Sequence, residues 1–267
     1  MILVCSLLIL ISSELHAEPR RVIALAPHVT ELVYAVDAQD QLVGVVEYSD
    51  YPPEAKSLPR IGDAFRFDLE SILSLEANLA LAWRGGTPIA VVNSLERLGI
   101  EVKWIETETL SDVPFALRQL SEMLDTQPIG DRVALDFEKN LSQLRATFNV
   151  NQPLVSVFYQ VSRRPLYTLG RDHILNQALQ VCAMRNVFDE LEVEAAVVSQ
   201  EAVIDANPEL FLAAQADIDP FSDWRQSKLE RLIDARFHQI DPDLLIRPGP
   251  RILIGIERLC RLHPEAP

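Results

Sequence analysis

Residues 128–148 have the sequence PIGDRVALDFEKNLSQLRATF, in which apolar residues recur at steps of three and four. Charged residues fall between these positions, and Pro128 stands where proline is favoured at the start of a helix. This periodicity predicts one amphipathic helix, about 30 Å long at roughly 1.5 Å per residue. The apolar stripe of the predicted helix comprises Ile129, Val133, Phe137, Leu141, Leu144 and Phe148.

Short apolar runs alternate with helical patterns on both sides of this segment. Strands are predicted at residues 21–26, 42–47, 79–83 and 102–106, and after the long helix at 154–160 and 209–213. Helices are predicted at residues 31–36, 69–75, 89–98, 114–124, 174–182, 224–233 and 251–262. This alternation is typical of an α/β fold in which helices cover largely parallel sheets.

A repeat at an offset of 131 residues indicates two related halves of the chain. The segment from Glu70 to Ala82 aligns with the segment from Glu201 to Ala213, each a helix followed by a strand. Chance similarity between two amphipathic units is the alternative. A genuine repeat predicts two Rossmann-like lobes joined by the single long helix, with limited closure around a bound molecule. The predicted boundaries are a signal peptide at 1–17, lobes at 18–126 and 150–267, and a linker helix at 127–149.

The composition restricts the classes of protein to which the chain can belong. Of its 267 residues, 48% are hydrophobic and 24% are charged, which is typical of a globular protein and excludes a disordered chain. The chain carries 24 basic and 39 acidic residues, which gives a net charge of -15. This excess of negative charge argues against a nucleic acid as a partner.

The N-terminal stretch has features of a secretory signal peptide. Met1–Ile11 carries no charge, and this run is shorter than the roughly 20 apolar residues that span a bilayer. Ala17 is a small residue suited to cleavage, which would leave Glu18 at the start of an exported chain. The usual basic residues at the start are missing, and a buried N-terminal strand is the alternative.

Cleavage at this point would leave two cysteines, Cys182 and Cys260. In an oxidising compartment such a pair favours a disulfide over two separately buried thiols, which are the alternative. The sequence has no phosphate-binding loop, nucleophile elbow or cysteine-pair metal motif, and no two histidines are four residues apart. We therefore predict no catalytic residues and no metal site. His28 lies in a strand-to-helix loop, where a ligand contact and an ordinary polar role are both open.

Two loops at the carboxyl ends of predicted strands carry the strongest signals for ligand binding. Tyr48-Ser-Asp-Tyr-Pro-Pro53 follows one strand, and Trp83-Arg-Gly-Gly86 follows another. Open parallel sheets bind ligands at this edge, and glycines allow a backbone to approach a ligand closely. Trp83 beside Arg84 offers a flat apolar face next to a donor group, which favours a large planar ligand with amide or carboxylate arms. Core packing is the alternative for Trp83.

Several of these motifs together resemble those of a known family. They are Arg21-Val-Ile-Ala-Leu25, Ala26-Pro27, Thr30-Glu31, the two loops just described, and the C-terminal stretch around Cys260. From about Arg21 to Cys260 the chain is similar to the periplasmic cobalamin-binding proteins of vitamin-uptake ABC transporters. The resemblance implies a periplasmic, monomeric, two-lobed protein with a helical backbone. Such a protein carries cobalamin or a related corrinoid to the membrane permease dimer of an ABC importer, with no cofactor and no chemistry of its own.

The resemblance also implies roles for individual residues. Tyr48 and Trp83 match aromatic residues that line the corrinoid cleft, and Asp243 and Arg247 match residues that face the ligand from the second lobe. A surface ion pair between Asp243 and Arg247 is the alternative. The complete set of implied ligand-binding residues is Tyr48, Asp50, Phe65, Trp83, Arg84, Gly85, Gly86, Asp243 and Arg247.

Glu70 and Glu201 match two glutamates, one on each lobe, that in this family dock into arginine pockets on the membrane subunits. Their equivalent positions in the repeat suit a pseudo-twofold protein that sits on a twofold transporter. The alternative is that each carboxylate only complements the N-terminus of its own helix.

The chain departs from this family at two positions of the cleft. Tryptophans that are usual there are replaced by Ala64 and Ala195, and each lost aromatic contact is worth about tenfold in affinity. Compensating aromatic contacts are expected from Phe65, Phe67 and Tyr159. Without such compensation, the ligand is expected to be a biosynthetic precursor or another flat molecule.

Two alternatives to a corrinoid carrier follow. In the first alternative, a protein of the same fold binds haem or a ferric siderophore, and His28, Tyr48 or Tyr51 approaches the metal. From another class, an exported hydrolase could use the same edge of the sheet. The lack of a histidine beside a serine or cysteine nucleophile in a recognisable motif argues against a hydrolase.

Overall fold

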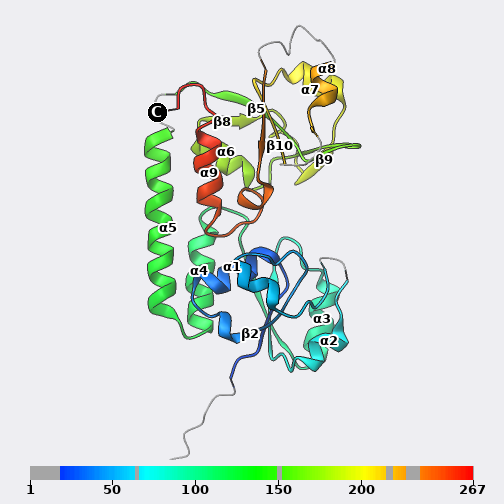
Figure 1. The fold of residues 1–267 in the computed structure, drawn as a ribbon, viewed down its shortest axis with the longest axis vertical. Coiled ribbons are helices and arrows are strands. Elements are labelled where there is room, and N and C mark those ends of the chain that lie inside the picture. Colours follow the sequence, from blue (N-terminus) through cyan, green and yellow to red (C-terminus); the bar gives the residue numbers. More distant parts are fainter. Residues whose placement is uncertain (1–18, 64–65, 149–151, 215–218, 227–234, 267) are drawn as a thin grey trace, which may run out of the picture.

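The computed structural model describes residues 19–63, 66–148, 152–214, 219–226 and 235–266. Two α/β lobes lie one above the other, and the long helix α5, Gln127–Phe148, runs along one side of both (Figure 1). This confirms the two-lobed α/β architecture and the long helix expected from the sequence. The predicted signal peptide and Phe65 lie outside the described residues. Within the described ranges, no helix is both long enough and apolar enough to cross a bilayer.

The N-terminal lobe is built on a four-stranded parallel sheet in the order β2-β1-β3-β4. Its strands are β1 Val22–Ala24, β2 Leu42–Val45, β3 Leu79–Trp83 and β4 Glu101–Ile105. Its helices are α1 Pro27–Ala35, α2 Leu69–Ser74, α3 Ile89–Arg97 and α4 Asp112–Met123, with 3-10 helices at Gln39–Gln41 and Pro53–Ser57. The central strands β1 and β3 are buried until Trp83, as expected for apolar strands that are covered on both faces.

The C-terminal lobe contains a parallel sheet in the order β11-β10-β5-β8 and a small antiparallel sheet in the order β6-β7-β9. The parallel strands are β5 Val155–Gln160, β8 Met184–Asn186, β10 Leu210–Ala214 and β11 Arg236–Ile240. The antiparallel strands are β6 Ser162–Arg163, β7 Leu166–Leu169 and β9 Ala195–Val197. The helices are α6 Leu175–Val181, α7 Gln200–Ala206, α8 Ser222–Gln226 and α9 Ile252–Cys260, with a 3-10 helix at Pro242–Leu244.

The sequence patterns missed β8 and β11, the two edge strands of the second parallel sheet. β8 is only three residues long, and β11 is mostly half-buried with polar residues at several positions. Neither strand therefore shows the apolar run on which the prediction of a buried strand depends. The predicted helix at 224–233 lies only partly within the described residues, where α8 ends at Gln226.

The internal repeat is present in the structure. Helices α2 and α7 begin at Leu69 and Gln200, and strands β3 and β10 begin at Leu79 and Leu210, so both pairs are 131 positions apart. The parallel sheets also share one strand order, because β8-β5-β10-β11 repeats β2-β1-β3-β4. The equivalence therefore extends from single elements to the topology of the whole sheet.

Helix α5 connects the cores of the two lobes. Its predicted apolar stripe is buried or half-buried at every position, and the side chains of Phe137, Leu141 and Phe148 are fully within the core. A single cluster of buried apolar side chains extends from β1 and α1 through α4 and α5 to α6, α9 and β5. At Gly130, a Cβ atom would lie 2.1 Å from Oγ of Ser121 on α4, so glycine is needed for the close approach of α4 and α5. The lobes thus share one apolar core through this helix.

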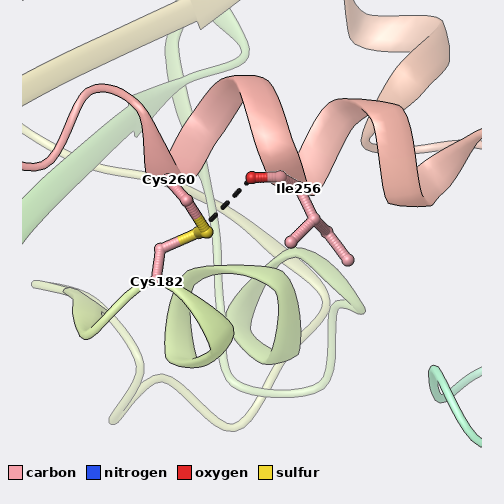
Figure 2. Close-up of a disulfide and its surroundings, with 3 residues drawn as sticks. All are labelled: Cys182, Ile256 and Cys260. Carbon is pink, nitrogen blue, oxygen red and sulfur yellow. Dashed lines mark hydrogen bonds between the residues drawn. A yellow bond between two sulfur atoms is a disulfide. The ribbon is translucent and has the colours of Figure 1, made fainter. Parts of the chain in front are cut away.

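The predicted disulfide between Cys182 and Cys260 is formed, with the two Cα atoms 4.6 Å apart. Cys182 directly follows α6 and Cys260 ends α9, so the bridge ties together two helices that pack on each other (Figure 2). The sulfur of Cys182 also lies 3.5 Å from the carbonyl oxygen of Ile256 on α9. The bridge closes a loop with a sequence separation of 78 residues, which restricts the unfolded chain considerably.

Candidate functional site

Trp83 occupies the carboxyl end of β3, at the edge of the sheet that faces the other lobe. Its indole ring packs against the following turn, where a Cβ atom on Gly85 or Gly86 would lie 2.7 Å or 2.3 Å from the ring. The sequence suggested that these glycines allow close approach to a ligand. In the structure they make room first for the ring of Trp83 itself, and each also lines a cavity.

Two cavities share Trp83 in their walls. The larger, of about 440 Å³, lies between the lobes and is lined by Trp83, Gly85, Thr107, Glu108, Asp172, His173, Ile174, Glu194, Ile246 and Pro248. The smaller, of about 290 Å³, lies within the N-terminal lobe, and its lining includes His28, Tyr48, Asp63, Phe67, Gly86 and Thr87. Four of the residues suggested by the sequence, Tyr48, Trp83, Gly85 and Gly86, are thus brought together in adjoining cavities.

His28 is a buried residue of the smaller cavity. It meets the ring of Trp83 edge-on, with the ring centroids 4.9 Å apart, and its Nε2 lies 3.3 Å from Oγ1 of Thr107. Burial, with a smaller contribution from the charge of Arg247, lowers the pKa of His28 to about 3. The imidazole is therefore neutral at neutral pH. His28 thus packs against the ring of Trp83. Tyr48 is the more accessible residue, because 75% of its surface is exposed, and its backbone φ is 64°.

Asp50 and Arg247 belong to a cluster of charged residues that joins the lobes. Nη1 of Arg247 donates to Asp50 at 2.7 Å, and Nη2 lies 3.0 Å from the carboxylate of Asp243. The side chain of Arg247 is only 13% exposed and does not line the larger cavity, although its neighbours Ile246 and Pro248 do. The suggested pairing of Asp243 with Arg247 is present, but it forms part of a contact with the other lobe.

The pKa values of the two aspartates in this cluster move in opposite directions. Burial raises the pKa of Asp50, but its hydrogen bond to Arg247 and the charge of that arginine outweigh burial and leave the pKa below its ordinary value. Burial, reinforced by repulsion from Asp50 and Asp241, raises the pKa of Asp243 despite the attraction of Arg247. Asp50 therefore ionises more readily than Asp243.

Glu31 and Arg251 complete this cluster, and the sequence analysis assigned neither of them a role. Arg251 binds both carboxylate oxygens of Glu31, at 2.5 Å and 2.7 Å, and its guanidinium lies 3.8 Å from the ring centre of Tyr51. Glu31 comes from α1 of the N-terminal lobe, whereas Arg251 immediately precedes α9 of the C-terminal lobe. We call Glu31, Asp50, Asp243, Arg247 and Arg251 the inter-lobe cluster.

Arg84 does not face either cavity. Its guanidinium lies 4.4 Å from the ring centre of Trp104, and its Nε is 3.4 Å from a carboxylate oxygen of Glu106. Trp104 and Glu106 belong to β4 or directly follow it, so Arg84 is held on the neighbouring strand. The donor group expected beside Trp83 is therefore directed away from the cleft.

The aromatic residues expected to compensate for the missing tryptophans are placed differently. Phe67 lines the smaller cavity. Tyr159 is 2% exposed within the core of the C-terminal lobe, where burial raises its pKa to about 12, so it is not available to a ligand. Ala195 begins β9 and is exposed, whereas Ala64 and Phe65 lie outside the described residues. Of the two expected substitutes within the described residues, Phe67 is thus the one that lines a cavity.

Glu70 and Glu201 are exposed in the first turns of α2 and α7. Both helices lie on the side of the molecule opposite α5, one on each lobe (Figure 1). Their N-termini are already capped, α2 by the carboxylate of Asp68 and α7 by the hydroxyl of Ser199. Hydrogen bonds to its own backbone and to Ser199 lower the pKa of Glu201. Neither helix needs its glutamate as a cap.

The sequence pattern of the periplasmic binding protein family matches residues 22–232, which include both parallel sheets except β11. The chain belongs to the periplasmic binding protein family. Among curated members, the vitamin B12-binding protein of Vibrio vulnificus strain CMCP6 is 36% identical over 258 residues, covering 96% of this chain and 94% of that protein. The vitamin B12-binding protein of Vibrio cholerae strain O395 is 34% identical over 263 residues, covering 97% and 95%.

Solved structures of periplasmic binding proteins agree with this assignment. The periplasmic vitamin B12 binding protein of Vibrio cholerae superposes with a TM-score of 0.82 at 33% identity, covering 91% of this chain and 96% of that one. A periplasmic heme-binding protein from Roseiflexus superposes with a TM-score of 0.80 at 23% identity, covering 92% and 98%. At that lower identity the likeness concerns the fold alone. The described residues of this periplasmic binding protein contain no group of three metal-ligating side chains placed to hold an ion.

Proposed function

We propose that this protein is a periplasmic substrate-binding protein that captures cobalamin or a related corrinoid between its lobes. The observation that carries this proposal is the 440 Å³ cavity between the lobes, with Trp83 in its wall, in a chain 36% identical to a vitamin B12-binding protein along nearly its whole length. The protein acts as a monomer and delivers the corrinoid to the permease of an ABC importer. The signal peptide proposed for residues 1–17 places it in the periplasm.

The lining of the larger cavity suits the chemistry of a corrinoid, which is a flat macrocycle with amide arms. Trp83, Gly85, Ile174, Ile246 and Pro248 supply apolar surface for the macrocycle. Thr107 and three carboxylates, Glu108, Asp172 and Glu194, supply acceptors for amide N–H groups. The apolar residues come from both lobes, so a bound macrocycle would contact the two lobes at once.

Calorimetric titration of residues 18–267 with cyanocobalamin tests this proposal, with haem as the parallel ligand. We expect one-to-one binding of cyanocobalamin with a sub-micromolar dissociation constant, or more than about 8 kcal/mol of binding free energy. Binding of haem without binding of cyanocobalamin would contradict the corrinoid assignment and favour the alternative within the same fold. In that case Tyr48, which is 75% exposed at the smaller cavity, is the residue best placed to approach the iron.

We also propose that Glu70 and Glu201 contact the two membrane subunits, one from each lobe. The double variant Glu70→Ala/Glu201→Ala is expected to bind cyanocobalamin with unchanged affinity, because both side chains are exposed and line neither cavity. Corrinoid uptake by cells that depend on this protein should fall by about tenfold or more, since two buried charge pairs with the permease would be lost.

The matched control for this pair is Glu122→Ala/Glu257→Ala, which removes one exposed glutamate from α4 and one from α9. This control has the same change in net charge and should support uptake at the wild-type rate. Normal uptake by the Glu70→Ala/Glu201→Ala variant would show that these glutamates do not dock.

A further inference from the structure

Three acidic side chains at the larger cavity have no partner within the described chain. Glu108 follows β4, Asp172 follows β7, and Glu194 directly precedes β9, so they reach the cavity from three different segments. All three are exposed, and the structure shows no ion pair or side-chain hydrogen bond for any of them with the residues it describes. Glu31, Asp50, Asp243 and Glu106, by contrast, are each paired with an arginine. Three unpaired carboxylates therefore lie at this cavity.

Arginines next to the lining residues in the sequence are directed away from the cavity. Arg84 separates Trp83 from Gly85, Arg171 precedes Asp172, and Arg247 separates Ile246 from Pro248. Each arginine is instead held by other side chains, namely Trp104 and Glu106, Glu190 and Glu192, and the inter-lobe cluster, respectively. The described lining of the larger cavity consequently includes no lysine and no arginine.

The two histidines at the cavities supply no positive charge near neutral pH. Burial lowers the pKa of His173, which lines the larger cavity, to about 4. His28, in the smaller cavity, has a pKa of about 3, as described above. The net charge of the described lining of the larger cavity is therefore negative, from Glu108, Asp172 and Glu194.

We propose that the cleft selects its ligand by charge, with Glu108, Asp172 and Glu194 as the residues that determine this specificity. A carboxylate accepts hydrogen bonds from an amide N–H group, but it repels another carboxylate. An incompletely amidated corrinoid carries a carboxylate where cobalamin carries an amide, and the arms of haem also end in carboxylates. The cleft therefore prefers macrocycles whose arms end in amides. This inference rests on the proposed function, because it names which corrinoids the same cavity accepts.

The test compares cyanocobalamin with its separated monocarboxylic acids, in which one side-chain amide has been hydrolysed. At about 10 mM salt, we expect at least one of these acids to bind the wild-type protein about tenfold more weakly than cyanocobalamin. Salt at about 300 mM should reduce this ratio of dissociation constants, because exposed charges are screened. In the triple variant Glu108→Gln/Asp172→Asn/Glu194→Gln, the ratio should fall to about twofold or less.

A second triple variant controls for the change in total charge. Glu96→Gln/Glu122→Gln/Asp136→Asn neutralises three exposed carboxylates on α3, α4 and α5, away from both cavities. This control should keep the wild-type ratio. Equal affinity of the wild-type protein for cyanocobalamin and all of its monocarboxylic acids would overturn the proposal, as would an unchanged ratio in the first triple variant.

If the proposed function is wrong, the binding experiments give a result that differs from a failure of the charge proposal alone. If no corrinoid binds but haem does, the corrinoid assignment is wrong. The proposed selection by charge, called here the charge rule, is then tested by comparing the affinity of the protein for haem with its affinity for haem diamide. The rule predicts that the diamide binds about tenfold more tightly than haem and that the first triple variant removes this preference. Equal or tighter binding of haem itself would overturn the rule. A chain that binds none of these macrocycles contradicts both proposals.

Discussion

Trp83→Ala is expected to weaken the binding of cyanocobalamin by about 30- to 150-fold, which corresponds to roughly 2–3 kcal/mol. The indole ring stands between the two cavities and contributes to the walls of both. Truncation removes this wall and also leaves the Gly85-Gly86 turn without the ring against which it packs. Isothermal titration calorimetry of the purified variant with cyanocobalamin measures the loss of affinity.

Two further variants separate a loss of the aromatic wall from a loss of folding. Trp83→Phe keeps an aromatic ring and removes an indole N–H that has no acceptor among the described residues, so we expect a loss of less than about tenfold. Trp104→Ala removes a tryptophan that packs on Arg84 and lines neither cavity, and its affinity should stay within about threefold of the wild type. A folded Trp83→Ala variant with wild-type affinity would contradict the proposed cleft.

Glu31→Ala is expected to lower the free energy of unfolding by about 3–5 kcal/mol, the usual cost of removing one partner from a buried ion pair. The side chain of Glu31 is 3% exposed, and it binds Arg251 with both oxygens and lies 3.5 Å from Arg247. Its removal leaves the guanidinium groups of Arg247 and Arg251, whose side chains are 13% and 15% exposed, without this acceptor. Urea denaturation of the wild-type and variant proteins at neutral pH measures the difference.

Removing the charges of both Glu31 and Arg251 should restore most of the lost free energy of unfolding. The double variant Glu31→Leu/Arg251→Met replaces the pair with apolar side chains, and such replacements are often close to neutral. As an exposed control, Glu257→Ala breaks the 2.6 Å pair with Arg261 on α9 and should cost less than about 1 kcal/mol. If Glu31→Ala loses no more stability than Glu257→Ala, the inter-lobe cluster does not hold the lobes together.

The parts of the site that were predictable depend on local signals. Tyr48 and Trp83 each follow or end a predicted strand, and the carboxyl ends of parallel strands share one edge of a sheet. This rule alone places both residues beside one cavity. The positions of Glu70 and Glu201 on equivalent helices also followed from the repeat, because a repeated pattern of apolar residues repeats the element that it forms.

The parts that were not predictable depend on which distant side chains meet. Arg84 follows Trp83 directly, but it turns to Trp104 and Glu106 on the neighbouring strand. Tyr159 lies on a buried strand, so the aromatic contact expected from it is not available to a ligand. In both cases the residue type was suited to the expected role, and the direction of the side chain decided against it.

The sequence by itself determined the long helix, the two α/β lobes and their equivalence, because apolar periodicity reports which face of each element is buried. It also predicted the pairing of Cys182 with Cys260, because these two cysteines would remain after the expected cleavage at Ala17, and the structure confirms the bond. Only the tertiary structure decided that Arg251 meets Glu31 and that Arg247 meets Asp50, across 220 and 197 positions of the chain. A charged side chain carries no periodic signal for its partner. Its partner is set by the relative orientation of the lobes, which the shared core around α5 fixes.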